Sequence, residues 1–231
     1  MKPKRGPTRP LPARAFGRPP RKRVGLLGGS FNPAHAGHRH ISEMALKYLR
    51  LDEVWWLVSP QNPLKSSKEM APLAERLAGA QACCRHPRLR ATAVETELGT
   101  RYTADTLKAL RHRFPRTQFL WIMGADNLRQ IERWEAWTSI FHRLPIAVFA
   151  RPAYDSKALA GKAASRFKKA RRSLRDAGRL ASLTPPAWVF FHSRLHPASA
   201  TSIRRGEGQP EWISPNGTSP NGKGPRQKRR G

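Results

Sequence analysis

The chain has 231 residues, 39% of them hydrophobic, and carries a formal net charge of +29. This length suits one domain with appendages, and no apolar run approaches the roughly 20 residues that a membrane-spanning helix needs. The charge indicates affinity for polyanions such as nucleotides, nucleic acid or acidic membranes, but it carries no information about the fold.

Short apolar runs alternate with helical patterns along the middle of the chain. The predicted strands are 24–27, 54–58, 89–94, 119–123, 146–149 and 188–191. The predicted helices are 37–49, 72–85, 103–113, 125–130, 134–141 and 156–176, with a short one from residue 201. Apolar strands separated by helices are typical of βαβ units, so we predict an α/β fold: a Rossmann-like, doubly wound parallel sheet with helices on both faces. Ligands of such sheets bind at the carboxyl ends of the strands, near the switch in strand order.

Both ends of the chain are rich in Lys and Arg and lack acidic residues. We therefore predict disordered basic tails at residues 1–22 and 214–231, flanking a single domain of residues 23–213. The N-terminal stretch lacks the apolar core of a secretory signal. The two cysteines, Cys83 and Cys84, are adjacent and form neither a metal-ligand spacing nor a disulfide framework, which favours a cytoplasmic protein.

A third basic block, residues 157–179, holds nine Lys or Arg against one Asp. Its pattern predicts a helix with a charged face. The sequence leaves open whether this helix forms a lid, a subunit contact or a patch that attracts anionic substrates. A charge run of this kind is most often a solvated face.

Residues 28–38, GGSFNPAHAGH, follow the first predicted strand and lead into the first predicted helix. Glycines at such a place let the main chain approach a ligand and accept positive φ, and the amides of a helix start bind anions. His35 precedes the helix and His38 enters its first turn, so both imidazoles can face one phosphate cluster and stabilise charge in a transition state. The alternatives are a capping histidine or a zinc ligand, although no third ligand stands close in the sequence.

This stretch resembles the N-terminal signature of the HxGH nucleotidyltransferase superfamily, roughly GGxFxPxHxGH, with Asn32 where Asp is commoner and a polar cap is expected. Residues 198–204, ASATSIR, resemble the superfamily's C-terminal signature ISxTxxR, with Ala198 in place of Ile. The second stretch alone would be assigned as an ordinary helix cap. Paired with the first, it indicates a phosphate site built from both.

Further stretches are similar to those of nicotinate mononucleotide adenylyltransferases within this superfamily: GADNL at 124–128, SPQNPLKSS at 59–67, RYTADTL at 101–107, RW at 133–134 and RP at 151–152. The resemblance implies transfer of AMP from ATP to nicotinate mononucleotide, which gives deamido-NAD and pyrophosphate. It implies that His38, His35 and Arg204 are catalytic. The residues it implies for ATP binding are Gly28, Gly29, Ser30, Phe31, His35, His38, Gly124, Asp126, Ser199, Thr201 and Arg204.

For the mononucleotide, the resemblance implies contacts by Asn62, Tyr102, Thr103, Trp134 and Arg151. Thr103 and the amides near Tyr102 would bind the pyridine carboxylate, Trp134 would stack on the ring and Arg151 would pair with the phosphate. Asp126 would accept hydrogen bonds from the ribose of ATP. The alternative assignments are a core tryptophan for Trp134 and a helix N-cap for Asp126.

The resemblance also implies Mg²⁺ bound with ATP through phosphate oxygens and water, so no residue is expected as a direct metal ligand. A second candidate is another HxGH adenylyltransferase with nicotinamide mononucleotide or phosphopantetheine as the acceptor. A third, prompted by the charge, is a nucleic-acid-binding protein, although the chain has no RNA-recognition, zinc-finger or helix-turn-helix pattern. Incidental polyanion binding by the tails is compatible with each candidate. No membrane association is expected, and the sequence does not determine the oligomeric state.

Overall fold

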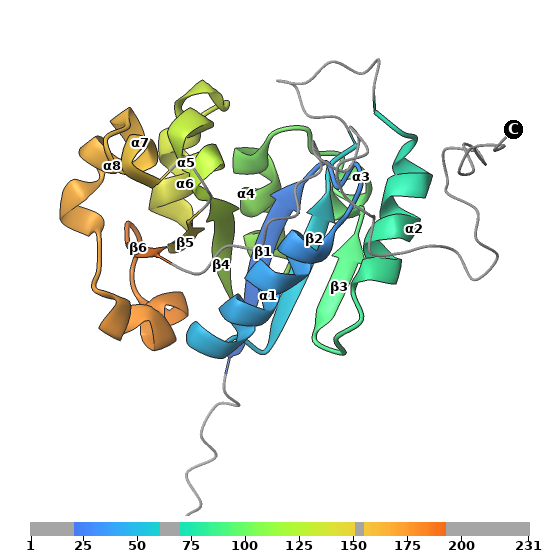
Figure 1. The fold of residues 1–231 in the computed structure, drawn as a ribbon, viewed down its shortest axis with the longest axis horizontal. Coiled ribbons are helices and arrows are strands. Elements are labelled where there is room, and N and C mark those ends of the chain that lie inside the picture. Colours follow the sequence, from blue (N-terminus) through green and yellow to red (C-terminus); the bar gives the residue numbers. More distant parts are fainter. Residues whose placement is uncertain (1–20, 61–69, 151–154, 193–231) are drawn as a thin grey trace, which may run out of the picture.

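The fold is centred on a six-stranded sheet in the order β3-β2-β1-β4-β5-β6 (Figure 1). The computed structural model describes residues 21–60, 70–150 and 155–192, and only the main chain at 155 and 156. Every neighbouring pair of strands is parallel. The strands are β1 Lys22–Gly29, β2 Glu53–Val58, β3 Leu89–Thr92, β4 Thr117–Gly124, β5 Ile146–Phe149 and β6 Trp188–Phe191.

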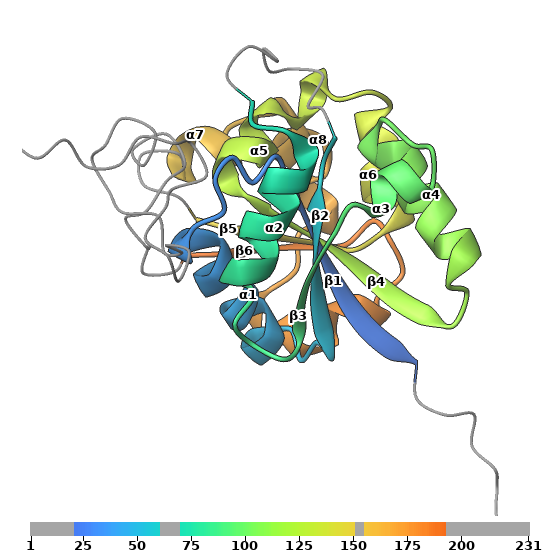
Figure 2. The same ribbon diagram turned by 90° about the vertical axis from the view of Figure 1, so that its right-hand side faces the viewer.

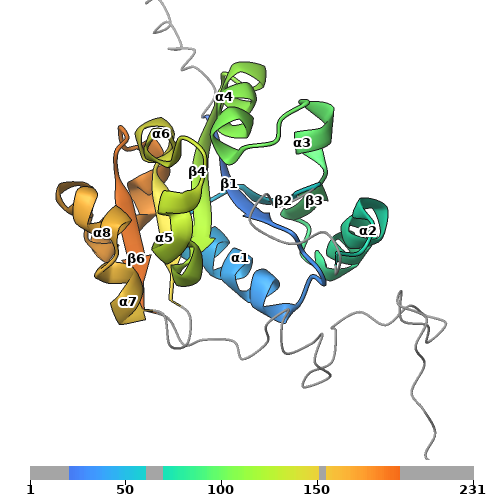
Figure 3. The same ribbon diagram turned by 90° about the horizontal axis from the view of Figure 1, so that it is seen from above.

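Helices cover both faces of the sheet (Figures 2 and 3). One face carries α1 Ala36–Tyr48, α2 Leu73–Cys83 and the 3-10 helix η4 Leu174–Ser182. The other face carries α4 Thr103–Arg113, α5 Ala125–Gln130, α6 Trp137–Arg143 and α8 Lys162–Arg166. Shorter elements are α3 Val94–Glu97, α7 Asp155–Leu159, η2 Ile131–Arg133 and η3 Lys168–Ala170.

The strands supply apolar side chains to both layers because their residues alternate between the two faces. In β4, Trp121 and Met123 belong to the core beneath α4 and α5, whereas Leu120 and Ile122 belong to the core beneath α1 and α2. A strand buried on both faces must be apolar along its whole length, which explains the continuous apolar runs in the sequence. The predicted fold class is confirmed.

The strand order reverses between β1 and β4. The chain runs outward through β2 and β3, then returns to the other side of β1. Leu27 lies opposite Ile122, so two residues further along both strands reach Gly29 and Gly124. The carboxyl ends of β1 and β4 therefore meet at the switch point, where an open parallel sheet places its ligand.

Most predicted elements agree with the structure to within two or three residues. The predictions of strands at 146–149 and 188–191 and of helices at 103–113 and 125–130 match the observed bounds. The third predicted strand is too long, because the chain leaves β3 at Thr92 and Val94 begins the short helix α3. A single apolar residue such as Val94 fits either structure, and periodicity does not distinguish them.

The prediction of one helix over 156–176 is wrong. Gly161 begins a separate helix, α8, and after η3 the main chain turns to the edge of the sheet. There the amide of Arg172 donates to the carbonyl oxygen of Trp188 at 2.7 Å, and the indole of Trp188 donates to the carbonyl of Phe167 at 2.8 Å. These bonds to β6 outweigh the helical propensity of the segment.

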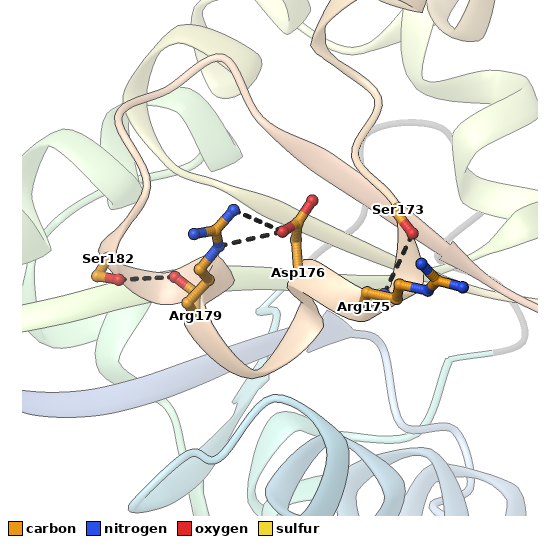
Figure 4. Close-up of polar contacts among 5 residues, drawn as sticks. All are labelled: Ser173, Arg175, Asp176, Arg179 and Ser182. Carbon is orange, nitrogen blue, oxygen red and sulfur yellow. Dashed lines mark hydrogen bonds and ion pairs between the residues drawn. The ribbon is translucent and has the colours of Figure 1, made fainter.

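The basic side chains of this block do form a solvated face. All nine Lys and Arg residues of 157–179 are exposed, while Phe167 and every alanine between them except Ala160 are buried. The 3-10 helix η4 begins with the Ser173 hydroxyl accepting from the amide of Arg175 at 3.3 Å, and Arg179 pairs with Asp176 at 2.6 Å (Figure 4).

Both predicted tails lie almost wholly outside the described residues, as does the predicted helix from residue 201. Within the described ranges, no helix combines the length and apolar character that crossing a bilayer requires.

Candidate active site

The two glycines of the motif lie inside β1 in extended conformation. A positive φ, which glycine accepts readily, occurs instead at Phe31, whose φ is 46°. The structure needs Gly28 for a different reason: a Cβ at this position would overlap the indole of Trp121, which is almost completely buried. Close packing against β4, and not a left-handed turn, thus explains the absence of a side chain at Gly28.

His35 and His38 together cap the start of α1. Nδ1 of His35 accepts from the amide of Gly37 at 3.1 Å, and Nδ1 of His38 accepts from the amide of His35 at 3.3 Å. This reciprocal arrangement is a capping box in which two imidazoles replace the usual hydroxyl and carboxylate. A nitrogen that accepts a hydrogen bond carries no proton, so each neutral ring has its proton on Nε2.

The capping alternative for the histidines is therefore correct for their Nδ1 atoms. The two ring centroids lie 3.8 Å apart, so the imidazoles are held as a pair at the helix start. His35 is 1% exposed, whereas His38 is partly exposed. The cap fixes both rotamers from the Nδ1 side and leaves the Nε2 edge of each ring as the donor edge.

Phe31 packs against this pair of imidazoles. Its ring stacks on Trp56 with centroids 5.1 Å apart and lies 4.7 Å from the ring of His38. Asn32 does not cap the helix, contrary to the expectation of a polar cap at this position. Its side-chain oxygen accepts from the amide of Ala71 at 3.4 Å, which links the motif to the chain that precedes α2.

The end of β4 lies beside the motif, as the sequence predicts. Gly124 is buried and is itself the N-cap of α5, with no side-chain capping bond. The N-cap alternative for Asp126 is therefore wrong: this residue lies in the first turn of α5 and is partly exposed.

Tyr102 and Thr103 begin α4. The carbonyl oxygen of Tyr102 accepts from the amides of Asp105 and Thr106 and from the buried hydroxyl of Thr106. No side chain caps this helix. Because the first amides of a helix have no partner within it, this start has donors available for an anion.

Trp134 is partly buried between the core and the surface. Its ring meets the ring of Trp121 edge to face, with centroids 6.5 Å apart. Trp121 also packs against Gly28. The side chain of Trp121 therefore lies between Trp134, which is predicted to stack on the substrate, and the end of β1.

The structure thus groups the motif residues 28–38 with Gly124 and Asp126 at the switch point. Five other predicted site residues lie outside the described residues: Asn62, Arg151, Ser199, Thr201 and Arg204.

Sequence reasoning missed two buried charged residues at this edge. Arg76 is 4% exposed, and Glu95 is 6% exposed. Burial raises the pKa of the Glu95 carboxyl to about 7, and a hydrogen bond from the Ser59 side chain opposes this shift. The signal for Arg76 was its spacing: it shares a helical face with Gly79, Ala80 and Cys83, all of them buried.

Comparison with known proteins agrees with this geometry. A family model described as cytidylyltransferase-like matches residues 26–206. A probable nicotinate-nucleotide adenylyltransferase from Caulobacter sp. (strain K31) is 52% identical over 182 residues, which cover 79% of this chain and 96% of the relative. One from Parvibaculum lavamentivorans is 50% identical over 189 residues, which cover 82% of this chain and 94% of the relative.

A solved structure is similar in fold. The nicotinic acid mononucleotide adenylyltransferase of Plasmodium falciparum, complexed with NaAD, superposes with a TM-score of 0.60 over 80% of this chain and 83% of that one, at 16% identity. The chain belongs to the cytidylyltransferase-like family and, within it, to the nicotinate-nucleotide adenylyltransferases. The resemblance inferred from the motifs is confirmed.

Proposed function

We propose that this protein is an enzyme that transfers AMP from ATP to nicotinate mononucleotide, with deamido-NAD and pyrophosphate as products. The observation that carries the proposal is the paired imidazole cap of α1, placed at the switch point of the sheet. Relatives about 50% identical over most of the chain bear the corresponding name. We place the reaction in the cytoplasm, in keeping with a sequence whose two cysteines, Cys83 and Cys84, are adjacent and form no disulfide framework.

The triphosphate of ATP lies, in this proposal, against the start of α1. The phosphate of the mononucleotide attacks the α-phosphorus in line, and pyrophosphate leaves from the opposite side. The nucleophile is already an anion, so no covalent enzyme intermediate is needed and catalysis consists of positioning and charge stabilisation. The Nε2 edges of His35 and His38 and the amides of Ser30 and Phe31 supply hydrogen-bond donors to the developing charge.

Gly28 and Gly29 let the nucleotide approach the main chain, Gly124 ends the adjacent strand, and Asp126 accepts from the ribose hydroxyls. The remaining triphosphate contacts are assigned to Ser199, Thr201 and Arg204, which lie outside the described residues. Arg204 is the third catalytic residue in the proposal because a guanidinium offers a fixed fork of donors to phosphate oxygens.

The acceptor binds between α4 and Trp134. The uncapped amides at Tyr102 and Thr103, with the Thr103 hydroxyl, suit the pyridine carboxylate. Trp134 suits the pyridinium ring, a cation–π contact worth about 0.5–2 kcal/mol. Asn62 and Arg151 complete the proposed acceptor site from outside the described residues.

A magnesium ion with ATP is part of the proposal. Mg²⁺ keeps several waters and binds through substrate phosphates, so the proposal assigns no residue as a direct metal ligand. When bound, the ion neutralises charge on the phosphates held by His38 and the Ser30–Phe31 amides.

The test is pyrophosphate release from ATP by the full chain with each of three acceptors: nicotinate mononucleotide, nicotinamide mononucleotide and phosphopantetheine. The expected result is release with the nicotinate compound and a clear preference over the amide, since helix-start amides favour a carboxylate. A preference for the amide or for phosphopantetheine would contradict the assigned substrate while leaving adenylyl transfer intact. No release with any acceptor would contradict the reaction itself.

A further inference from the structure

Arg76 is the fourth residue of α2, and its buried charge has an unusual set of partners. Its guanidinium donates to four main-chain carbonyl oxygens, those of Ala71, Ser30, Ser59 and Pro60, at 2.7 to 2.8 Å. The side chain takes part in no ion pair with a carboxylate of the described residues, and an arginine in a protein remains protonated. A full positive charge is therefore enclosed by the backbone at the carboxyl ends of β1 and β2.

The four carbonyls come from three segments that are separate in the sequence. Ser30 follows β1, Ser59 and Pro60 follow β2, and Ala71 precedes α2. Direct hydrogen bonds also link these segments: the amide of Ser59 donates to the carbonyl of Gly29 at 3.0 Å, and the amide of Ala71 donates to Asn32. Only a planar guanidinium has enough donors in a fixed fork to join all of them, because a lysine ammonium is a point donor.

The bond to Ser30 determines the direction of the next amide. The carbonyl of Ser30 and the N–H of Phe31 belong to one peptide group, which is planar and trans, so they point in opposite directions. Nη1 of Arg76 holds the carbonyl oxygen at 2.7 Å on the protein side. The N–H of Phe31 must then point away from Arg76.

The same peptide precedes a residue in a costly conformation. Phe31 has a φ of 46°, which a non-glycine residue adopts only when its surroundings enforce it. The ring of Phe31 is fixed between Trp56 and His38, and the carbonyl before it is fixed by Arg76. A positive charge on the carbonyl side also polarises the peptide and strengthens its N–H as a donor.

We infer that Arg76 is a positioning residue for adenylyl transfer: from inside the protein, its guanidinium orients the Ser30–Phe31 peptide so that the Phe31 amide donates to the nucleotide's phosphates. The inference rests on the proposed function for the identity of the nucleotide. Arg76 does not touch the nucleotide itself and acts through the main chain of Ser30.

The test compares Arg76→Met with Arg85→Met, which removes the same charge from an exposed position just beyond the end of α2. Equilibrium binding of α,β-methylene ATP and of adenosine is measured for both variants and the wild type. Loss of one hydrogen bond to a charged group corresponds to about 10- to 100-fold in affinity. We expect Arg76→Met to weaken triphosphate binding by this factor with little change for adenosine, and Arg85→Met to change neither.

Equal weakening for both ligands would show that Arg76 only maintains the fold and would overturn the inference, as would wild-type binding of both. If Arg76→Met does not fold, Arg76→Lys is measured in the same way, since it keeps the charge but loses the fork. A measurement on the wild type needs no variant: the amide proton of Phe31 should move downfield on saturation with α,β-methylene ATP, and an unmoved signal contradicts the inference. None of these measurements requires turnover, so a failed acceptor assay would count against the proposed function alone.

Discussion

Arginine side chains differ in their surroundings at the two ends of the parallel strands, called here the carboxyl edge and the amino edge. At the carboxyl edge, Arg76 is buried and holds four carbonyls of three segments. At the amino edge, the amide of Arg172 bonds to the first residue of β6. The 3-10 helix η4 at this edge displays Arg179, whose side chain is 70% exposed and pairs with Asp176 of the same helix (Figure 4). The amino edge carries exposed arginines such as Arg179, whereas the carboxyl edge carries the motif.

This contrast shows why a charge of +29 says little about function. An exposed pair is screened by water and salt and contributes at most about 1 kcal/mol. A buried charge must be compensated by its surroundings, and it fixes the groups that compensate it. The few buried polar groups at the carboxyl edge therefore determine the geometry of the site.

The largest effect is expected for His38→Ala. Removing one donor to a developing phosphate charge lowers kcat on the order of 100- to 1,000-fold. Steady-state pyrophosphate release with ATP and nicotinate mononucleotide measures this effect. His40→Ala on the same helix is the control and should retain the wild-type kcat.

Because His38 also caps α1, thermal unfolding of the variant must accompany the kinetics. A folded His38→Ala protein with near-normal kcat would refute the assignment of this imidazole to the reaction.

A smaller effect, of about 3 kcal/mol, is expected from Glu95 in the pH dependence of stability. Its folded-state pKa of about 7 lies above the ordinary value of 4.5, because burial disfavours the carboxylate. Between these pH values the unfolded chain ionises while the folded protein keeps the proton, so the free energy of unfolding falls as the pH rises. Glu95→Gln removes this loss, and its stability relative to the wild type should increase from pH 4.5 to pH 8.

Urea unfolding at several pH values measures the difference, with Glu97→Gln, exposed on the same short helix, as the matched control. A constant difference between Glu95→Gln and the wild type over this range would mean that Glu95 is not held in a desolvated site.

The smallest effect is expected at the amino edge. Asp176→Asn breaks the pair with Arg179 and should change the free energy of unfolding by less than about 1 kcal/mol, without altering kcat/KM for ATP. Chemical denaturation and steady-state kinetics check both values. A large fall in kcat/KM would indicate that η4 takes part in substrate capture. It would contradict the conclusion that only the carboxyl edge serves the reaction.

The sequence was sufficient for the sheet because most strands contain a continuous apolar run, and each run lies within one segment. The helix predicted over 156–176 failed for a non-local reason: the alanine spacing is helical, but the main chain of Arg172 bonds to Trp188, sixteen positions away. Short-range periodicity contains no information about such a partner.

The site shows the same division. His35 and His38 were predictable because both stand in one contiguous motif. The structure adds that together they cap the start of α1. The spacing of Arg76 could place it on the buried face of α2, but its partners could not be predicted, because they lie at residues 30, 59, 60 and 71 and converge only in the fold. The positive φ of Phe31 was not predictable either, because its ring stacks on Trp56, which is distant in the sequence. The packing of Trp121 that requires Gly28 is also non-local.

Amide hydrogen exchange with and without α,β-methylene ATP and Mg²⁺ tests the contrast between the two edges most directly. Slower exchange of residues 30–38, with unchanged exchange of 174–182, is the outcome that this account requires. Protection confined to 174–182, or none at 30–38 when the nucleotide is saturating, would contradict it.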